Sequence, residues 1–246
     1  MAEGRKSLST GDQKPRPVVM FSSSDRRGFL RSAGWLAAGG LAVAAGCRSG
    51  EEEVAPGEDL MREHGVLKRI LLVYDELVRR LGAGAEVPPA AVADSAGIIR
   101  NFIEDYHERL EENYLFPRFQ KAGQLPDLVA TLIQQHQAGR RLTDQVQAEA
   151  SFAALKSESD RQRLKAALQQ FIRMYSPHEA REDTVLFPAF RKLVSQHEYD
   201  SLGEDFEKEE RRKFGEDGFE MMVDKVAAIE KSLGIFDLAQ FTPPAP

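Results

Sequence analysis

The residues of this chain that could carry chemistry lie in a sequence repeat. The segment HERLEENYLFPRF begins at His107 and recurs as HEAREDTVLFPAF from His178, 71 residues later. Each copy has a glutamate four residues after its histidine, namely Glu111 and Glu182. Side chains four residues apart share one face of an α-helix. The repeat therefore predicts two helices that each direct one imidazole and one carboxylate toward a common interior site.

A further histidine precedes each copy at a matched distance. His64 lies 43 residues before His107, and His136 lies 42 residues before His178. Four imidazoles and two carboxylates suit two metal ions, each bound by two histidines, with both glutamates bridging the pair. Such mixed ligands fit iron or manganese better than a structural zinc ion, which takes Cys and His in one tetrahedron. The predicted metal ligands are His64, His107, Glu111, His136, His178 and Glu182.

Simpler interpretations exist for each residue taken singly. One His-x-x-x-Glu pair on a charged helix is commonly a solvated pair, and one histidine on an apolar face is commonly a hydrogen-bonded core residue. The duplication, with a matched upstream histidine for each copy, favours the metal site. His197 has no counterpart in the repeat and stands among polar residues, so we expect it on the surface. Candidate acceptors for imidazole N–H groups are Glu108, Glu112, Glu179 and Asp183.

Three prolines near the repeated pairs predict features of the backbone. Each copy ends in Leu-Phe-Pro, at 115–117 and at 186–188, which predicts apolar packing and a helix kink below the site. Pro177 directly precedes His178. It either re-aims that histidine within one helix or separates two helices.

Helical periodicity extends along the chain from Leu60. Apolar residues recur at steps of three and four up to Leu81. Glycine and proline clusters then separate helices expected at 90–121, from after the break at 122–126 to about 152, and at 160–194, followed by shorter helices at 199–213 and 219–232. No run of alternating apolar and polar residues predicts a strand. The expected fold is all-α, an antiparallel four-helix bundle with extra short C-terminal helices.

The first 47 residues differ from the rest of the chain. Paired arginines at 26 and 27 precede an uncharged, Ala/Gly-rich stretch over 32–46, a pattern that resembles a twin-arginine export signal. The stretch is too short to cross a bilayer as a helix. It ends at Cys47, the only cysteine, whose position resembles the lipid-modified cysteine of a bacterial lipoprotein. The alternative is an unmodified cysteine just past the leader.

These features divide the chain into four parts: an export signal over 1–47, a polar tether over 48–57, the bundle over 58–195 and a helical extension over 196–246. We expect an exported protein of the periplasm or cell envelope, anchored to a membrane by a lipid on Cys47. Residues 1–46 hold 7 of the 33 Lys and Arg and 3 of the 39 Asp and Glu, so the remainder has a net charge of −10. This acidic body argues against nucleic acid as a partner.

The paired H-E-x-x-E motifs, each followed by Leu-Phe-Pro, resemble the hemerythrin-like family of His/Glu (HHE) cation-binding domains over 60–193. The resemblance implies a non-haem di-iron centre with carboxylate and oxo or hydroxo bridges; manganese or a mixed pair is the alternative. Oxygen-carrying hemerythrins place a second histidine four residues after the third-helix histidine, where this chain has Arg140, and Lys68 stands at the matching place after His64. Arg140 either neutralises a bridging glutamate or points to solvent, and we expect solvent.

With four histidines and two glutamates, the site is more similar to that of bacterial hemerythrin-like proteins associated with iron–sulfur cluster repair and nitric oxide handling. We therefore expect a di-iron protein that reacts with O₂, NO or H₂O₂, for sensing, scavenging or protection from damage. Two alternatives stay open: a di-iron redox enzyme of the peroxidase or nitric oxide reductase type, and an extracytoplasmic protein for iron storage or delivery. The sequence identifies no redox partner.

Overall fold

The structure is a computed structural model that describes residues 54–151 and 153–244. The paired arginines at 26 and 27, the Ala/Gly-rich stretch and Cys47 lie outside these residues. Within them the chain is helical and has no strand, so the predicted all-α fold is confirmed. None of the described helices is long and apolar enough to cross a membrane.

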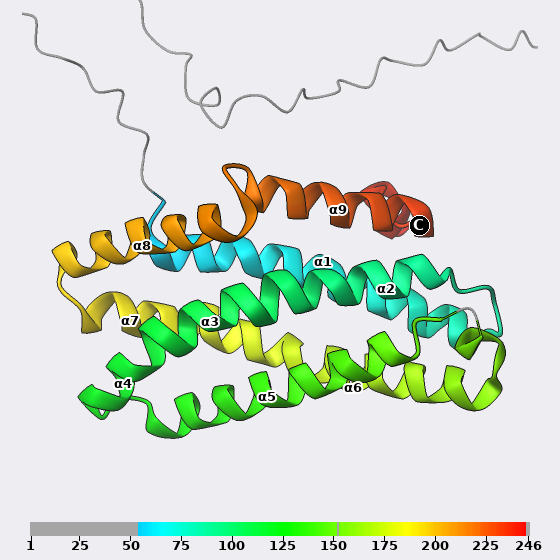
Figure 1. Cartoon of the computed structure of the whole chain (residues 1–246), viewed down its shortest axis with the longest axis horizontal. Coiled ribbons are helices and arrows are strands. Elements are labelled where there is room, and N and C mark those ends of the chain that lie inside the picture. Colours follow the sequence, from blue (N-terminus) through cyan, green and yellow to red (C-terminus); the bar gives the residue numbers. More distant parts are fainter. Residues whose placement is uncertain (1–53, 152, 245–246) are drawn as a thin grey trace, which may run out of the picture. The chain divides into compact units, whose positions relative to one another are not determined.

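Four long helical runs form the bundle, and we number them in chain order (Figure 1). Bundle helix 1 is α1 (Pro56–Gly82), and bundle helix 3 is α5 (Pro126–Ala148). Bundle helix 2 joins, end to end, α2 (Pro89–Ile98), the π-helix η1 (Ile99–His107), α3 (Glu108–Leu110), the π-helix η2 (Glu111–Leu115) and α4 (Phe116–Ala122). Bundle helix 4 joins α6 (Glu158–Arg181), the π-helix η4 (Glu182–Leu186) and α7 (Phe187–Leu193). Successive bundle helices run in opposite directions (Figure 1).

Local sequence signals set the ends of these helices. Both α1 and α5 begin with proline, whose missing N–H would have no partner in a first helical turn. The Ser157 side chain caps α6 by accepting a hydrogen bond from the backbone N–H of Asp160. Helix α4 ends at Ala122, and the Gly123 that follows it has a φ of 63°, a conformation that favours glycine. The resulting connections are short, which makes successive helices antiparallel neighbours.

A π-helical turn precedes the proline in each copy of the repeat. In η2 the N–H of Phe116 donates to the carbonyl of Glu111, five residues earlier. In η4 the N–H of Phe187 donates to the carbonyl of Glu182 in the same way. A proline follows each phenylalanine, and because its ring clashes with the carbonyl four residues before it, a wider turn at this point relieves the clash. Both widened turns begin at a predicted metal ligand.

Pro177 lies inside α6, which continues from Glu158 to Arg181. The alternative that this proline separates two helices is therefore wrong. The first copy of the repeat differs here, because the residues that lead to His107 form the π-helix η1. The two copies thus reach their histidines along different backbones.

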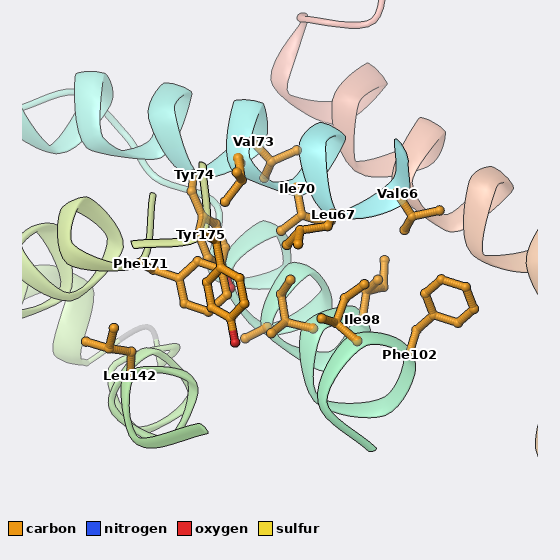
Figure 2. Packing of buried hydrophobic residues seen from close by; sticks show 14 of the residues in the cluster. Val66, Leu67, Ile70, Val73, Tyr74, Ile98, Phe102, Leu142, Phe171 and Tyr175 are labelled. Carbon is orange, nitrogen blue, oxygen red and sulfur yellow. The ribbon is translucent and has the colours of Figure 1, made fainter. Parts of the chain in front are cut away.

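Aromatic and aliphatic side chains pack bundle helices 1 and 4 together next to the predicted site. Figure 2 shows Ile70 and Tyr74 on α1 and Phe171 and Tyr175 on α6, and all four are buried. The rings of Tyr74 and Phe171 meet edge to face with centroids 5.2 Å apart. The rings of Phe171 and Tyr175 lie 4.3 Å apart. This packing fixes the two helices that carry His64 and His178.

The extra C-terminal helices pack on the outside of the bundle. Helix α8 (Gln196–Phe214) lies against α1, and α9 (Gly218–Leu233) lies against α1 and α2 (Figure 1). Arg69 of α1 donates two hydrogen bonds to the carboxylate of Glu230 on α9. Two short 3₁₀ turns, η3 (Ala154–Lys156) and η5 (Leu238–Phe241), complete the described elements. The predicted C-terminal helices are therefore present.

Gly139 of α5 allows Tyr175 to approach the backbone, and its substitution tests this packing. A Cβ atom at Gly139 would lie 2.0 Å from the Tyr175 hydroxyl oxygen, which donates a hydrogen bond of 2.6 Å to Glu108. Because the ring is buried and the added methyl group would overlap it, Gly139→Ala should lower the free energy of unfolding by about 1–3 kcal/mol. Urea denaturation followed by far-UV circular dichroism measures this change.

Gly97→Ala in α2 is the matched control, because a Cβ atom there meets nothing within 4 Å. It should raise the free energy of unfolding by about 0.5–1 kcal/mol, since alanine loses less backbone entropy than glycine in a helix. Two substitutions with the same effect would contradict the close approach of Tyr175.

Candidate metal centre

The six predicted ligands meet inside the bundle, and every bundle helix contributes to them. Bundle helices 1 and 3 supply one histidine each, and helices 2 and 4 supply one histidine and one glutamate each from the repeat. All six side chains are at most 4% exposed. The predicted residues therefore share one buried site: His64, His107, Glu111, His136, His178 and Glu182.

The site divides into two clusters, each able to surround one cation. The first half consists of His64 and His107 with Glu111, and the second half of His136 and His178 with Glu182. Within each cluster, one ligand atom from every residue lies within 4.8 Å of the others. The imidazole centroids are 4.7 Å apart in the first half and 5.1 Å apart in the second.

Each glutamate also reaches across to the other half. The Oε2 atom of Glu182 is 3.2 Å from Nε2 of His178 and 3.4 Å from Nε2 of His64. The Oε2 atom of Glu111 is 3.4 Å from Nε2 of His136 and 3.9 Å from Nε2 of His107. Both carboxylates therefore lie between the histidines of the two halves, where bridging ligands would lie.

The carboxylates of Glu111 and Glu182 are fully buried, yet within the described part of the chain none of their four oxygens makes a hydrogen bond of normal geometry. A buried acceptor without a partner costs about 1–3 kcal/mol, and more when it is charged. Four such oxygens in one place are unfavourable unless a cation balances them. This arrangement fits metal ions better than it fits an ordinary polar core.

Hydrogen bonds orient all four imidazole rings toward the centre. The Nδ1 atom of His64 lies 2.7 Å from Asp183 Oδ1, and that of His136 lies 3.1 Å from Glu112 Oε1. An acceptor at Nδ1 holds the ring proton there and leaves Nε2 free to bind a metal. The prediction that Glu112 and Asp183 accept from imidazoles is thus confirmed. Each of these acceptors comes from the other half of the bundle. Asp183 on bundle helix 4 accepts from His64 on helix 1, and Glu112 on helix 2 accepts from His136 on helix 3.

The other two histidines have acceptors that sequence reasoning missed. Nδ1 of His107 lies 2.7 Å from Glu63 Oε2, and Nδ1 of His178 lies 2.9 Å from Gln135 Oε1. Glu63 and Gln135 occupy matching places, each directly before the upstream histidine of its repeat. This position could have predicted the two acceptors, because both copies of the repeat place a side chain with an acceptor oxygen there.

Arg140 is not turned to solvent, so that expectation is wrong. Its guanidinium group lies 2.7 Å from Glu108 Oε2 and 2.8 Å from Glu112 Oε1. It therefore neutralises acids beside the site rather than a predicted bridging glutamate. Glu108, which also accepts from Tyr175, and Glu179 are not imidazole acceptors; Glu179 lies 3.8 Å from Nζ of Lys68. Helix spacing alone could not reveal these contacts, since they join different helices.

Burial and charge shift several pKa values at the site. Burial lowers the pKa of His64, but its two carboxylate partners outweigh burial and raise it to about 10. Burial and the second glutamate raise the pKa of Glu111 to about 8. Burial and the neighbouring Asp59 raise the pKa of the Glu63 carboxyl. A metal entering the free site must therefore displace protons, so binding becomes tighter as the pH rises.

Two phenylalanines of the Leu-Phe-Pro triplets cover ligand rings. Phe187 stacks on His64 and Phe116 lies against His136, each with ring centroids 5.5 Å apart. Both phenylalanines are buried, so the predicted apolar packing at the site is confirmed. His197 is exposed on α8, as predicted.

A helical bundle with two clusters of histidine and glutamate at its centre defines a class of cation-binding proteins. Residues 55–190 match the family model described as the hemerythrin HHE cation binding domain. The chain therefore belongs to the hemerythrin HHE family. Uncharacterized proteins of Mycobacterium tuberculosis and Mycobacterium bovis are each 56% identical to it over 193 residues, which is 78% of this chain and 76% of each relative. No solved structure gave a significant match.

Substitution of single ligands tests the assignment. His107→Ala and Glu182→Ala should each lower the metal content of the purified protein, because each removes a donor from a buried cluster. His197→Ala should leave the content unchanged, because this side chain is on the surface. Elemental analysis by mass spectrometry, with circular dichroism to verify folding, makes the measurement. A loss of metal from His197→Ala equal to the other two would refute the assignment.

Proposed function

We propose that this protein holds a non-haem di-iron centre that reacts with O₂, NO or H₂O₂, for sensing, scavenging or protection from damage. The observation that carries the proposal is the position of Glu111 and Glu182, each within 4 Å of imidazole nitrogens from both halves. Two separate mononuclear sites would not need carboxylates placed between the histidines of both halves. A pair of ions held by the same two carboxylates would need this placement.

The donor chemistry favours iron. Each half offers two imidazoles and one carboxylate, the ligand set of non-haem iron proteins that keep positions open for a small molecule. Manganese is the alternative, since it takes similar ligands. When bound, an iron pair would supply electrons and open coordination positions to such a molecule.

The protein's own residues would prepare the site for this chemistry. The four acceptors at Nδ1 orient the imidazoles, and Phe116 and Phe187 keep water from the ligand rings. The side chain of Arg140 is held by Glu108 and Glu112, so it supplies no ligand where oxygen-carrying hemerythrins have a histidine. An ion in the second half would therefore have one protein ligand fewer than in those carriers, and a small molecule could take that coordination position.

Iron analysis and spectroscopy test the proposal. Protein purified after iron-replete expression should contain two irons per chain, with Mössbauer and optical spectra of a coupled pair that change on reduction and on exposure to NO or O₂. Fewer than one metal ion per chain would refute the di-metal site. Sustained consumption of peroxide or NO would favour the redox enzyme instead, and iron that a mild chelator removes would favour storage or delivery.

We also propose that the chain is exported by the twin-arginine route and anchored in the cell envelope by a lipid on Cys47. The support is sequence alone: the paired arginines, the uncharged stretch after them, and the single cysteine at its end. Export of a folded protein would suit a centre that is loaded with metal before transport.

Substitution in the leader tests the export proposal. Full-length protein produced in a bacterium with this export route should partition into the detergent phase of a Triton X-114 extract. Cys47→Ser should move it to the aqueous phase, whereas the neighbouring Ser49→Ala should not. Replacing Arg26 and Arg27 by lysine should keep the precursor in the cytoplasm. Wild-type protein found in the aqueous phase would contradict the lipid anchor.

A further inference from the structure

The acceptors that bind the Nδ1 atoms of the ligand histidines differ between the two halves of the site. In the first half, His107 has the carboxylate of Glu63 as its acceptor. In the second half, the equivalent His178 has the side-chain amide of Gln135. The two acceptors occupy the same place in the repeat and make contacts of nearly equal length, 2.7 Å and 2.9 Å. What differs is the kind of acceptor: one half has a carboxylate, which can carry a negative charge beside a metal-bound ring, where the other has an amide, which cannot.

The second pair of acceptors adds to this difference. Among the described residues, the cationic side chain paired with Asp183, beside His64, is Lys68, whose Nζ lies 3.9 Å from the other carboxylate oxygen and whose side chain is 55% exposed. Glu112, beside His136, shares the same oxygen with Arg140 at 2.8 Å. Its other oxygen accepts from a second guanidinium group, that of Arg109, at 2.6 Å. Arg140 is shared with Glu108, and Lys68 with Glu179. Glu112 nevertheless has two guanidinium groups within 2.8 Å, whereas the lysine beside Asp183 is 3.9 Å away.

These charges act on the metal through the imidazoles. A metal-bound histidine that donates its N–H to a carboxylate becomes a more basic ligand, and such partners change metal affinity about 10–100-fold. A ring that donates to a neutral amide, or to a carboxylate already paired with arginine, gains less, because those acceptors carry less net negative charge. The first half therefore favours higher positive charge than the second.

We propose that the two halves are unequal, with Glu63 and Gln135 as the residues that set the difference. The first half binds its cation more tightly and stabilises the more oxidised ion. The second half binds its cation more weakly and accepts the first electron when a one-electron reductant such as dithionite reduces the pair. This inference rests on the proposed di-metal site and adds an order of loading and of reduction to it.

Stepwise titration of metal-free protein with Co²⁺ under nitrogen tests the order of loading. Wild-type protein should show a tight step and a weaker step by calorimetry and visible absorption. His178→Ala should retain the tight step, and His107→Ala should lose it, which assigns the tight step to the first half. Glu63→Gln should weaken the tight step about 10–100-fold. Gln135→Glu should strengthen the weaker step, a gain that structural damage would not produce.

The double substitution Glu63→Gln with Gln135→Glu should bring the two steps together. Controls of the same chemistry on exposed positions of the same helices are Glu58→Gln and Gln134→Glu, and neither should move a step. In the iron form, addition of one electron equivalent of dithionite should give a Mössbauer spectrum with one ferrous and one ferric site. The double substitution should reduce the separation between the two reduction potentials.

The outcomes separate this inference from the proposed function. Binding of fewer than one ion per wild-type chain would refute the di-metal site itself. Two ions bound with equal affinity, or a Gln135→Glu variant whose weaker step does not tighten, would refute the inequality and leave the di-metal site in place. A tight step that survives His107→Ala and disappears in His178→Ala would reverse the assigned order and so overturn the inference.

Discussion

The burial of Glu111 and Glu182 without hydrogen-bond partners is the constraint on which the site depends. Protein interiors exclude ionised carboxylates unless something positive compensates them. Among the described residues, the groups paired with them are imidazole nitrogens, at 3.2–3.9 Å. Bound cations would supply the positive charge that balances these two carboxylates. The packing around the site, including Phe116 and Phe187, buries the two carboxylates but brings no positive charge to them.

The contacts around the imidazoles decide which nitrogen faces the centre. Each Nδ1 atom has an oxygen acceptor within 3.1 Å, so each Nε2 atom is available. Two of these acceptors belong to the same hairpin as their histidine, and two cross from the other hairpin. The orientation of the rings is therefore fixed only when both hairpins are packed together, which couples the geometry of the site to the packing of Tyr74, Phe171 and Tyr175.

Sequence reasoning predicted the helices and brought forward the six residues of the site, because both rest on local spacing. Apolar steps of three and four residues define a helix face, and a His-x-x-x-Glu pair lies on one such face wherever the helix is placed. The contacts of Arg140 were predicted wrongly because they depend on which side chains helix 2 presents to helix 3. Glu63 was missed for the same reason, although its position beside His64 is local. The π-helical turns at Glu111 and Glu182 were also not predicted, because a proline in a helix indicates a kink but not the width of the turn before it.

The two halves of the site correspond to two helical hairpins. His64 and His107 come from bundle helices 1 and 2, and His136 and His178 from bundle helices 3 and 4. A cation in either half would cross-link the two helices of one hairpin. The shared carboxylates would cross-link the two hairpins to each other. Because the free energy of binding then becomes part of the free energy of folding, the lifetime of this protein in the cell would follow its supply of metal.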